Sequence, residues 1–430
     1  MQDAWLPPGA GSTLETLRRA GIETWIVGGA VRDWLAGRAV GDVDLLVEAP
    51  LDSVRRALPG AIRIDARHPI VSLPRARVEI SAPRAGAASA ADDLALRDFT
   101  LNAIAWEPRS RTWLDPTGGR RDLSRRRLRS PRPEESFLHD PVRILRGIRL
   151  ARALALEIDP ETWRAMTREA PRLAGAPGER LQSELWRILA LPRPSPALEA
   201  LRSLGALAAL LPEVVRGVGV DQKPHHLEDV YEHALSVCDA TPADPLLRLA
   251  ALLHDVGKPD TQVGSGSGEG YSFHRHEAVA GPLIEQIGAR LRLSAEETTR
   301  VARLVRHHLI RPGDLASPAA VRRMLHRVGA DILPDLLALR RADLASRRPR
   351  WGHLEVWDVT SRRIRRIAAE ACASKLAIGG DDVMECLGIS KGRQVGVWLE
   401  RARQRVERDP RQNQRSKLRR WLRRQRDRRN

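Results

Sequence analysis

The sequence has few cysteines and no long apolar run, and these shortages exclude several classes of protein. Its three cysteines, Cys238, Cys372 and Cys386, are too scattered for a disulfide framework or for the ligand spacing of a metal site. No apolar run approaches the roughly 20 residues that a membrane-spanning helix requires. The first residues, MQDAWLPPGAGS, also lack the basic and apolar regions of a secretory signal. Together these features predict a reduced, cytoplasmic protein without a membrane anchor.

Acidic residues are also in short supply, with 54 Asp and Glu against 72 Lys and Arg, which gives a formal charge of +18. Such an excess favours a polyanionic partner, because each Lys or Arg that neutralises a phosphate releases a counterion. An arginine-rich genome would produce the same composition, so charge alone indicates nucleic acid without establishing it. The last thirty residues, with 14 basic residues against three acids, form either an RNA-binding helix or a solvated, frayed end.

The order of the sequence patterns predicts an α+β protein of several domains. A length of 430 residues favours about three or four domains, and a hydrophobic content of 42% is enough for globular cores. Up to about residue 125, short apolar strands such as TWIV and DVDLLV alternate with turns and helical segments. From about residue 135 the apolar period is 3.6 almost throughout. We therefore expect a small mixed or antiparallel sheet followed by an all-helical remainder.

Two aspartates on a predicted strand are the first candidate site. Asp42 and Asp44 alternate with Val43, so both side chains point to one face, about 7 Å apart. Carboxylates this close repel one another unless a cation lies between them, and Mg²⁺ commonly bridges carboxylates to substrate phosphates. Two such ions stabilise the attacking and leaving oxygens of an in-line phosphoryl displacement. The alternative interpretation is a turn followed by a solvated strand edge.

Upstream of this strand, two glycines and a basic residue extend the pattern. Gly28 and Gly29 let the backbone approach a triphosphate, and Arg32 can pair with its oxygens. The stretch GGAVRD followed by GDVDLLV resembles the active-site signature of the class II tRNA nucleotidyltransferases and bacterial poly(A) polymerases, in the polymerase-β-type superfamily. Four further segments match the same family in order: LRDFTLNAIAW (96–106), LDPTGGRRDL (114–123), FLHDPVRILRGIRLA (137–151) and GERLQSEL (178–185).

The resemblance implies a role for each matched residue before the helical region. Asp42 and Asp44 would hold the catalytic Mg²⁺ ions. The residues that would bind the triphosphate and the ribose of the nucleotide are Gly28, Gly29, Arg32, Asp33, Arg97, Asp98 and Asn102. For Asp98 and Asn102, a buried turn is the competing interpretation. Glu79, on the RVEIS strand, is either a third nearby carboxylate or a solvated strand residue.

The matched helix that the family calls its neck carries a charged side chain at every third position. Asp140, Arg143, Arg146 and Arg149 therefore crowd one helical face, which in most proteins is a solvated face. In the family, the Asp and the first Arg read the edge of the incoming base in place of a nucleic-acid template. Asp140 and Arg143 would thus select cytosine and adenine, and Arg146 would also bind the nucleotide. His139 is a departure, because the family usually has Glu there.

A second set of residues resembles the HD phosphohydrolase signature. His-Asp in tandem is followed by Gly-Lys-Pro in ALLHDVGKP, and further His and Asp residues recur on predicted helices. The metal ligands that the resemblance implies are His233, His254, Asp255 and Asp343, with His276 and either His307 or His308 nearby. Imidazole and carboxylate together suit a divalent transition metal such as Ni²⁺, Mn²⁺, Co²⁺ or Zn²⁺. The expected substrates are 2′,3′-cyclic phosphates, 2′-nucleotides or a terminal phosphate, and a non-catalytic HD fold is the alternative.

These resemblances predict four parts of the chain and a function. The parts are a nucleotidyltransferase head (1–128), a helical neck (129–195), a helical HD domain (196–370) and a basic helical tail (371–430). The chain would add CCA, or only CC, to the 3′ end of tRNA from CTP and ATP, as a monomer or a homodimer. The HD domain would supply an additional phosphohydrolase activity.

The expected product depends on the segment between the third carboxylate and the Arg-Asp-Phe motif. Full CCA addition in the family requires a flexible loop there, and enzymes that add only CC lack it. Residues 80–96 form only a short interval, so both products stay open. Two other functions also stay open: a relative of bacterial poly(A) polymerases, although that branch usually lacks the HD domain, and an RNA phosphohydrolase whose head only binds RNA.

Overall fold

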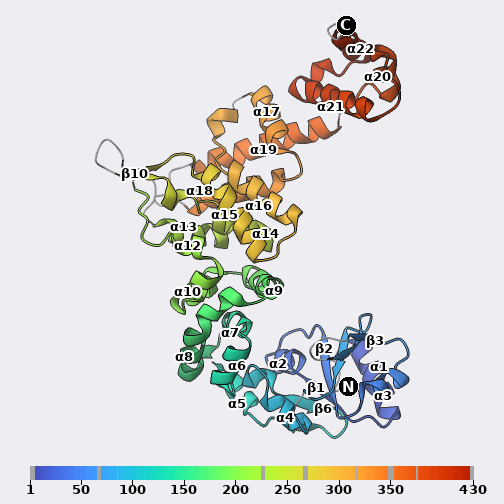
Figure 1. Ribbon diagram of the computed structural model, residues 1–430, viewed down its shortest axis with the longest axis vertical. Helices are drawn as coiled ribbons and strands as arrows, with labels where there is room; N and C mark the ends of the chain where they lie inside the picture. The colour runs from blue at the N-terminus through green and yellow to red at the C-terminus, as the bar shows by residue number, and fades with distance from the viewer. Residues whose placement is uncertain are drawn as a thin grey trace. The chain divides into compact units, whose positions relative to one another are not determined.

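The computed structural model describes residues 5–64, 69–84, 86–223, 228–264, 270–315, 317–346, 353–373 and 376–426. The chain divides into two compact units (Figure 1): residues 1–191 with 196–212, and residues 192–195 with 213–430. The predicted α+β class is confirmed, because one mixed sheet in the first unit is followed by a chain that is mainly helical. None of the helices in the described ranges is both long and apolar enough to cross a bilayer.

A mixed sheet of seven short strands forms the start of the first unit. The strands are β1 (Thr24–Val27), β2 (Val43–Val47), β3 (Ile62–Ile64), β4 (Ile70–Leu73), β5 (Val78–Ser81), β6 (Ala105–Glu107) and β7 (Thr112–Leu114). Their order is β3-β4-β5-β2-β1-β6-β7. Strands β2 and β5 run parallel, and the other neighbours are antiparallel.

Apolar side chains from the strands pack into two cores on opposite faces of this sheet. One core joins Ile26 and Leu45 to the helices α1 (Pro8–Arg19), α2 (Gly29–Leu35) and α3 (Leu51–Ala57). The other core joins Val27 and Leu46 to α4 (Ala90–Ala95). Because side chains alternate along a strand, Asp44 shares the face of Leu46, on the side of α4.

Helices follow the sheet within the first unit. They are α5 (Gly119–Ser124), α6 (Pro133–His139), α7 (Val142–Ala153), α8 (Pro160–Glu169), α9 (Gly178–Leu189), α10 (Ser195–Ser203) and α11 (Ala206–Leu210). A parallel bridge of two short strands, β8 (Arg127–Leu128) and β9 (Glu157–Ile158), connects the end of the head to the turn after α7. The sequence analysis missed this bridge, because a strand of two residues has no apolar period.

The second unit contains a helical body and a helical tail. The body helices are α12 (Pro212–Val215), α13 (Val230–Ala240), α14 (Pro245–Leu253), α15 (His276–Arg290), α16 (Ala295–His307), α17 (Pro318–Val328), α18 (Leu333–Ser346) and α19 (His353–Ala373). A hairpin of β10 (Gln262–Gly264) and β11 (Tyr271–Phe273) lies between α14 and α15 and also departs from the all-helical prediction. The helices α14, α16 and α18 pack against one another, and α13 packs against α14 and α18.

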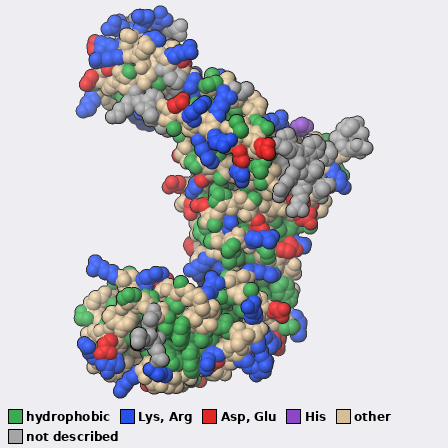
Figure 2. Space-filling model, turned by 180° about the vertical axis from the view of Figure 1, so that it is seen from behind, with side chains coloured by type: hydrophobic (Ala, Val, Ile, Leu, Met, Phe, Trp, Pro, Cys, Tyr) green, Lys and Arg blue, Asp and Glu red, His purple; other side chains and the backbone are tan. Residues whose placement is uncertain are grey.

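The tail consists of α20 (Gly380–Leu387), α21 (Arg393–Arg408) and α22 (Arg415–Arg426), which share a small apolar core. Seven of the twelve residues of α22 are basic, and the helix buries only Leu418 and Leu422. Lysine and arginine side chains accordingly gather over these C-terminal helices (Figure 2). As far as residue 426, the tail therefore ends in a basic helix, and its binding to RNA stays a prediction.

Candidate active sites

The strand register brings carboxylates together at one edge of the head sheet. Asp44 on β2 lies opposite Val27, the last residue of β1, and beside Glu79 on the parallel strand β5. Asp42 precedes β2, and its Oδ1 accepts a hydrogen bond of 2.8 Å from Arg77 Nε. Glu79 is exposed to solvent and also adjoins Asp44. It is therefore both a solvated strand residue and a third carboxylate near the two aspartates.

Gly28 follows β1 at a point where a side chain would be strained and crowded. Its φ of +72° lies in the left-handed region that favours glycine. A Cβ atom there would lie 3.1 Å from Asp44 Oδ2 and 3.0 Å from Arg97 Nη1. The backbone of the turn, a carboxylate and a guanidinium therefore meet at one point. Such a cluster offers both an anchor for cations and a donor for phosphate oxygens.

The electrostatics of Asp44 favour a bound cation. Burial raises the pKa of the Asp44 carboxyl, and the charges of Glu79 and Asp42 add to that rise. Arg97 and Arg32 act in the opposite direction without cancelling it. A divalent cation would offset the repulsion between the carboxylates, and Mg²⁺ prefers such oxygen ligands. The donor set therefore fits Mg²⁺.

A chain of polar contacts runs from the glycine turn toward the neck. Arg32 binds Asp33 through two N–H···O contacts of 2.9 Å and donates from Nη1 to Asn102 Oδ1 at 2.7 Å. Asn102 Nδ2 donates to Asp98 Oδ1 at 2.9 Å, and Arg146 Nη1 donates to Asp98 Oδ2 at 3.0 Å. Residues from three of the matched sequence segments are thus directly connected.

Glu184 on α9 completes this chain. Its Oε1 accepts from Arg146 Nε at 3.2 Å, and its Oε2 accepts from Arg149 Nε at 2.9 Å. At the centre of the chain, burial raises the pKa of Asp98, but Arg146 and Asn102 outweigh that effect, so the pKa is lowered. Asp98 is buried with its carboxylate engaged, as the buried-turn interpretation has it, and its contact with a nucleotide stays a prediction.

Asp140, at the C-terminal end of α6, has one engaged and one open carboxylate oxygen. Its Oδ2 accepts from Arg180 Nη2 at 2.7 Å and lies 3.5 Å from Arg143 Nε. Its Oδ1 is buried without a hydrogen-bond partner among the described residues. Arg143 also donates from Nη1 to Ser136 Oγ at 2.9 Å. The pair predicted to read the base thus lies together, with an acceptor still available.

Two residues of α9 were missed by the sequence analysis although their segment was matched. Arg180 holds Asp140, and Glu184 holds the neck arginines. Their spacing of four residues places them on one helical face, which was the available signal. His139, the departure from the family pattern, is exposed, and its Nδ1 lies 2.8 Å from Glu135 O. Asp140 is therefore held from α9 and not by the residue before it.

The short segment before the Arg-Asp-Phe motif is folded onto the head. Arg84 donates to Asp93 Oδ1 from its backbone N at 3.0 Å and from Nη1 at 3.2 Å. Asp93 is buried and also lies 3.4 Å from Arg97 Nη2. The segment is thus fastened to the same carboxylate that holds Arg97 beside Asp44. Ala85 lies outside the described residues.

In the body, six buried side chains from five helical regions converge around one carboxylate. They are His233, His254, Asp255, His276, His308 and Asp343. The carboxylate of Asp255 is central: its Oδ2 lies 3.0 Å from His254 Nε2, and its Oδ1 lies 3.2 Å from His276 Nε2. His308 Nε2 is 3.7 Å from the same Oδ1, and His233 Nε2 is 3.9 Å from Oδ2.

Asp343 on α18 closes the cluster, with Oδ1 3.3 Å from His233 Nε2. Two triads bring their ligand atoms within 4.8 Å of one another: His233 with His254 and Asp255, and Asp255 with His276 and His308. The four predicted ligands therefore lie in one place, together with His276.

Three imidazoles of this cluster have Nδ1 engaged by the backbone, which leaves Nε2 directed at the cluster. The Nδ1 atoms of His254, His276 and His308 lie 2.7, 2.9 and 2.7 Å from backbone carbonyl oxygens. A ring whose Nδ1 donates to a carbonyl keeps the Nε2 lone pair for a metal. Burial, with the charge of His254, lowers the pKa of His308 to about 3, so this ring is neutral at physiological pH.

The Nε2 atoms of His254 and His276 are buried near Asp255 without hydrogen-bond geometry. Gly257 permits the close approach of the two segments, because a Cβ atom there would lie 2.2 Å from His276 O. Open imidazole nitrogens around a carboxylate form a donor set that fits a divalent transition metal.

Of the two adjacent histidines that were candidates, His308 joins the cluster and His307 does not. Burial lowers the pKa of His307, and the charges of Arg327, Arg306 and Arg303 lower it further. His307 thus faces arginines, which corrects its assignment as a possible ligand. Neighbouring helical residues point about 100° apart, and no sequence pattern showed which of the two faces inward.

Three parts of the chain match known protein domains. Residues 24–85 and 59–129 match the poly A polymerase head domain, and residues 225–348 match the HD domain. Residues 155–216 match a region described as the probable RNA and SrmB-binding site of polymerase A.

Similarity to curated proteins extends over most of the chain. An A-adding tRNA nucleotidyltransferase of Deinococcus radiodurans is 35% identical over 405 residues, which cover 87% of this chain and 89% of the relative. A CC-adding tRNA nucleotidyltransferase of Thermus thermophilus is 34% identical and covered to 87% in both chains. A multifunctional CCA protein of Acidovorax sp. is 33% identical, with 88% of this chain and 96% of the relative covered.

Solved structures share the whole fold. The crystal structure of the Bacillus stearothermophilus CCA-adding enzyme in complex with CTP has a TM-score of 0.67 at 25% identity, with 98% of both chains covered. A Thermotoga maritima CCA-adding enzyme complexed with tRNA shares the fold at 20% identity and a TM-score of 0.57, with 93% and 90% covered.

Proposed function

Because the chain belongs to the tRNA nucleotidyltransferase family, we propose that it transfers CMP from CTP to the 3′ end of tRNA. The observation that carries the proposal is the meeting of Asp44, Arg97 and the Gly28 turn at one edge of the sheet. Asp42 and Asp44 are the proposed holders of Mg²⁺, and Arg97 and Arg32 are the proposed partners of the triphosphate oxygens.

In the proposed reaction, the 3′-oxygen of the tRNA bonds to the α-phosphorus of the nucleotide while the bond to the bridging oxygen breaks and pyrophosphate leaves. Mg²⁺ held by Asp42 and Asp44 would lower the pKa of the attacking hydroxyl and neutralise charge on the phosphates. The side chains hold this arrangement: Asp33 and Asn102 orient Arg32, and Asp98 orients Asn102. No side-chain base is required, and the hydroxyl proton passes to solvent.

Asp140 and Arg143 are the proposed readers of the base. A shift that uncovers the buried, unpaired Oδ1 of Asp140 would let it accept from the exocyclic amine of cytosine, and a guanidinium can donate to the ring nitrogen and carbonyl oxygen. Uracil presents a carbonyl oxygen where cytosine has its amine, so it would face the carboxylate with like partial charge. Arg180 supports this reading by keeping Oδ2 engaged.

The proposal that the chain adds only the two cytidines, and not the complete CCA, rests on the segment that contains Arg84. In the family, the change from CTP to ATP needs a mobile loop at this place. Here Arg84 is bonded to the buried Asp93, which also contacts Arg97, so a rearrangement would break contacts beside the site. Sequence identity gives no decision, because relatives of nearly equal identity are named A-adding and CC-adding.

The test uses tRNA ending at the discriminator base and tRNA ending in CC, each with labelled CTP or ATP supplied separately. We expect two cytidines on the first tRNA and no label on the second. AMP added to the CC-ending tRNA would contradict the CC assignment while leaving nucleotide transfer intact. The absence of any addition by the purified protein would contradict the proposal as a whole.

A second proposed activity, hydrolysis of phosphate esters, belongs to the HD cluster. It is supported by the imidazole nitrogens that converge on Asp255 without hydrogen-bond geometry. A divalent transition metal bound there would activate water and neutralise phosphate charge. The test is release of 2′- or 3′-nucleotide from 2′,3′-cyclic nucleotides, and of phosphate from 2′-nucleotides, with Ni²⁺, Mn²⁺, Co²⁺ or Zn²⁺ added singly. No turnover with any of these ions would contradict this activity.

A further inference from the structure

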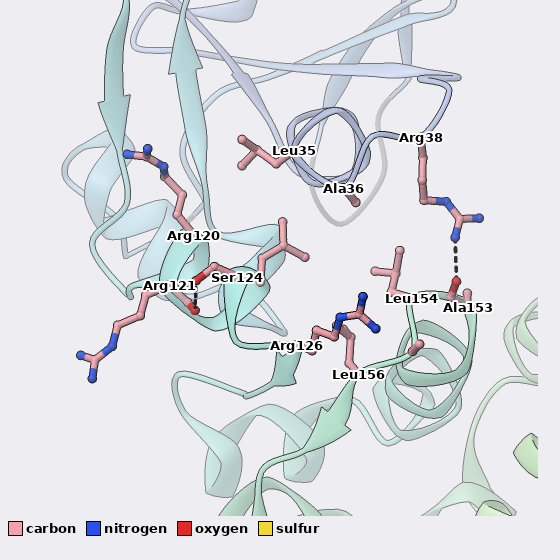
Figure 3. Close-up of a pocket in the computed structure, with 12 residues that line it drawn as sticks. Leu35, Ala36, Arg38, Arg120, Arg121, Ser124, Arg126, Ala153, Leu154 and Leu156 are labelled. Carbon is pink, nitrogen blue, oxygen red and sulfur yellow. Dashed lines mark hydrogen bonds between the residues drawn. The ribbon is translucent and has the colours of Figure 1, made fainter.

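A basic pocket of about 790 Å³ lies in the first unit, and none of the proposed nucleotide-binding residues lines it. Four arginines, Arg38, Arg120, Arg121 and Arg126, contribute to its lining, and no acidic residue does. The rest is mostly leucine and alanine from the C-terminal ends of α2, α5 and α7 and from the turn before β9. Figure 3 shows Arg126 next to Leu154 and Leu156, with Arg38 on the side of α2.

Within the described residues, these four arginines have no carboxylate partner, unlike the arginines of the nucleotide site, which pair with Asp33, Asp93 and Asp98. Arg38 donates from Nη1 to Ala153 O at 2.6 Å, a bond that Figure 3 marks. The guanidinium of Arg120 lies 4.4 Å from the centre of the Trp113 ring. In Figure 3 the guanidiniums of Arg38 and Arg126 lie on one side of the pocket, and those of Arg120 and Arg121 point away from them. Cations that line one pocket repel one another until an anion binds between them.

The walls of the pocket are fixed by backbone contacts. Glu157 N donates to Arg126 O at 2.8 Å, and Leu156 N donates to Ala151 O at 2.8 Å. The bridge of β8 and β9 continues directly from these residues. A cavity whose backbone is already ordered binds a ligand with little further loss of conformational entropy.

We propose that this pocket binds a backbone phosphate of the tRNA whose 3′ end occupies the nucleotide site. Guanidinium groups match phosphate oxygens in charge and in geometry. The lining has no amide or carboxylate that could act with an arginine in reading a base edge, and its one side-chain hydroxyl, on Ser124, donates to Arg121 O. Recognition through charge alone is the property of a backbone contact. This inference rests on the proposed transfer to tRNA.

The position of the pocket suits an RNA that is already held at its 3′ end. It lies at the C-terminal ends of α2 and α7, and Arg143 lies in the first turn of α7. Ten residues separate Arg143 from Ala153, which corresponds to about 15 Å along the helix. That length equals about four or five nucleotides of a stacked strand. A free nucleotide in the active site is too short to reach the pocket, whereas a tRNA is not.

The experiment compares Arg126→Gln and the double variant Arg38→Gln/Arg126→Gln with the control Arg55→Gln/Arg56→Gln, in the full-length protein. Arg55 and Arg56 are exposed on α3, so the control removes the same charge from another face of the head. We expect the KM for tRNA to rise about three- to tenfold per pocket arginine. The slope of log KM against log salt should fall by about 1 per arginine removed. The KM for CTP and kcat should stay unchanged.

Arg126→Lys, which keeps the charge, should recover most of the affinity, and this variant separates loss of charge from loss of folding. The inference would be overturned if the pocket and control variants had equal KM values for tRNA while the unmodified protein transferred CMP normally. An acidic protein segment would then be the occupant to test. A change in the KM for CTP alone would overturn it in favour of a free-nucleotide site. Failure of the unmodified protein to extend tRNA would instead contradict the proposed function.

Discussion

The head site and the HD cluster both gather carboxylates that fit metal ions, but their surroundings are opposite. In the head, the side chain of Asp42 is 74% exposed and the neighbouring cations are arginines. In the body, the side chain of Asp255 is 4% exposed and is surrounded by imidazoles and Lys258. An open set of hard oxygen ligands suits Mg²⁺ that arrives with a triphosphate. A closed set of imidazoles around a buried carboxylate suits an ion that stays when no substrate is bound.

The two sites should therefore be separable, and Asp44→Asn is the change with the largest expected effect. It removes one of the carboxylate charges that would hold Mg²⁺ at the sheet edge. Since metal stabilisation of the transferring phosphate is worth several kcal/mol, CMP addition should fall by at least about a thousandfold. Incorporation of labelled CTP into tRNA measures this loss, and hydrolysis of cyclic nucleotides should continue at the original rate.

Asp52→Asn is the matched control, because Asp52 is an exposed carboxylate on α3 of the same head. It should leave both activities unchanged. Surviving nucleotide addition in Asp44→Asn would refute the metal assignment. Loss of both activities together would contradict the separation of the two sites.

His254→Ala should have the reverse effect. It removes an imidazole whose Nδ1 is fixed by a carbonyl and whose Nε2 faces Asp255. Phosphohydrolase activity should fall at least about a hundredfold, by analogy with the loss on removing groups that orient metal ligands. We also expect Ni²⁺ or Mn²⁺ to raise the Tm of the unmodified protein, because an ion bound only to the folded state stabilises it, and this rise should disappear in the variant.

His274→Ala provides the control for this variant, since His274 is exposed and lies two residues before His276. Its metal-dependent rise in Tm should match that of the unmodified protein. An undiminished rise in His254→Ala would show that the ion binds elsewhere.

Asp140→Asn tests how the nucleotide site distinguishes CTP from UTP. The amide removes the negative charge that repels the uracil carbonyl and supplies a donor in its place. Because a well-placed pair of hydrogen bonds discriminates between bases by about 1–3 kcal/mol, the ratio of kcat/KM for CTP over UTP should fall about 5- to 150-fold. His139→Ala, at the neighbouring exposed position, should leave the ratio unchanged. An unchanged ratio in Asp140→Asn would remove the proposed role of Asp140.

The sequence indicated the components of both sites better than the contacts between them. Asp42 and Asp44 could be located because two-residue periodicity predicts a shared face, and the strand register brought Glu79 to the same edge. The HD cluster could be located because His254-Asp255 is followed by Gly-Lys-Pro, which resembles the HD signature. The class of fold also followed from the change of period near residue 130.

Contacts between distant segments could not be predicted in this way. The role of Glu184 depends on how α9 packs against α7, and no local pattern contains that information. The choice between His307 and His308 depends on the last turn of α16, where the helix ends. The bridge of β8 and β9 and the basic pocket beside it arise from tertiary pairing alone.

Glu184 gives the comparison its smallest and most specific test, since it is a buried carboxylate among arginines in the first unit, as Asp255 is a buried carboxylate among imidazoles in the body. Glu184→Gln leaves Arg146, Arg149 and Arg187 facing a neutral amide. These arginines are partly exposed, so solvent moderates the cost to about 1–3 kcal/mol, a few degrees in Tm. The KM for CTP should rise modestly because Arg146 also holds Asp98.

Thermal unfolding measures the stability change of Glu184→Gln. The control is Glu15→Gln, which changes an exposed carboxylate on α1. If Glu184→Gln stabilised the protein, the buried ion pairs of the neck would serve specificity at the expense of stability.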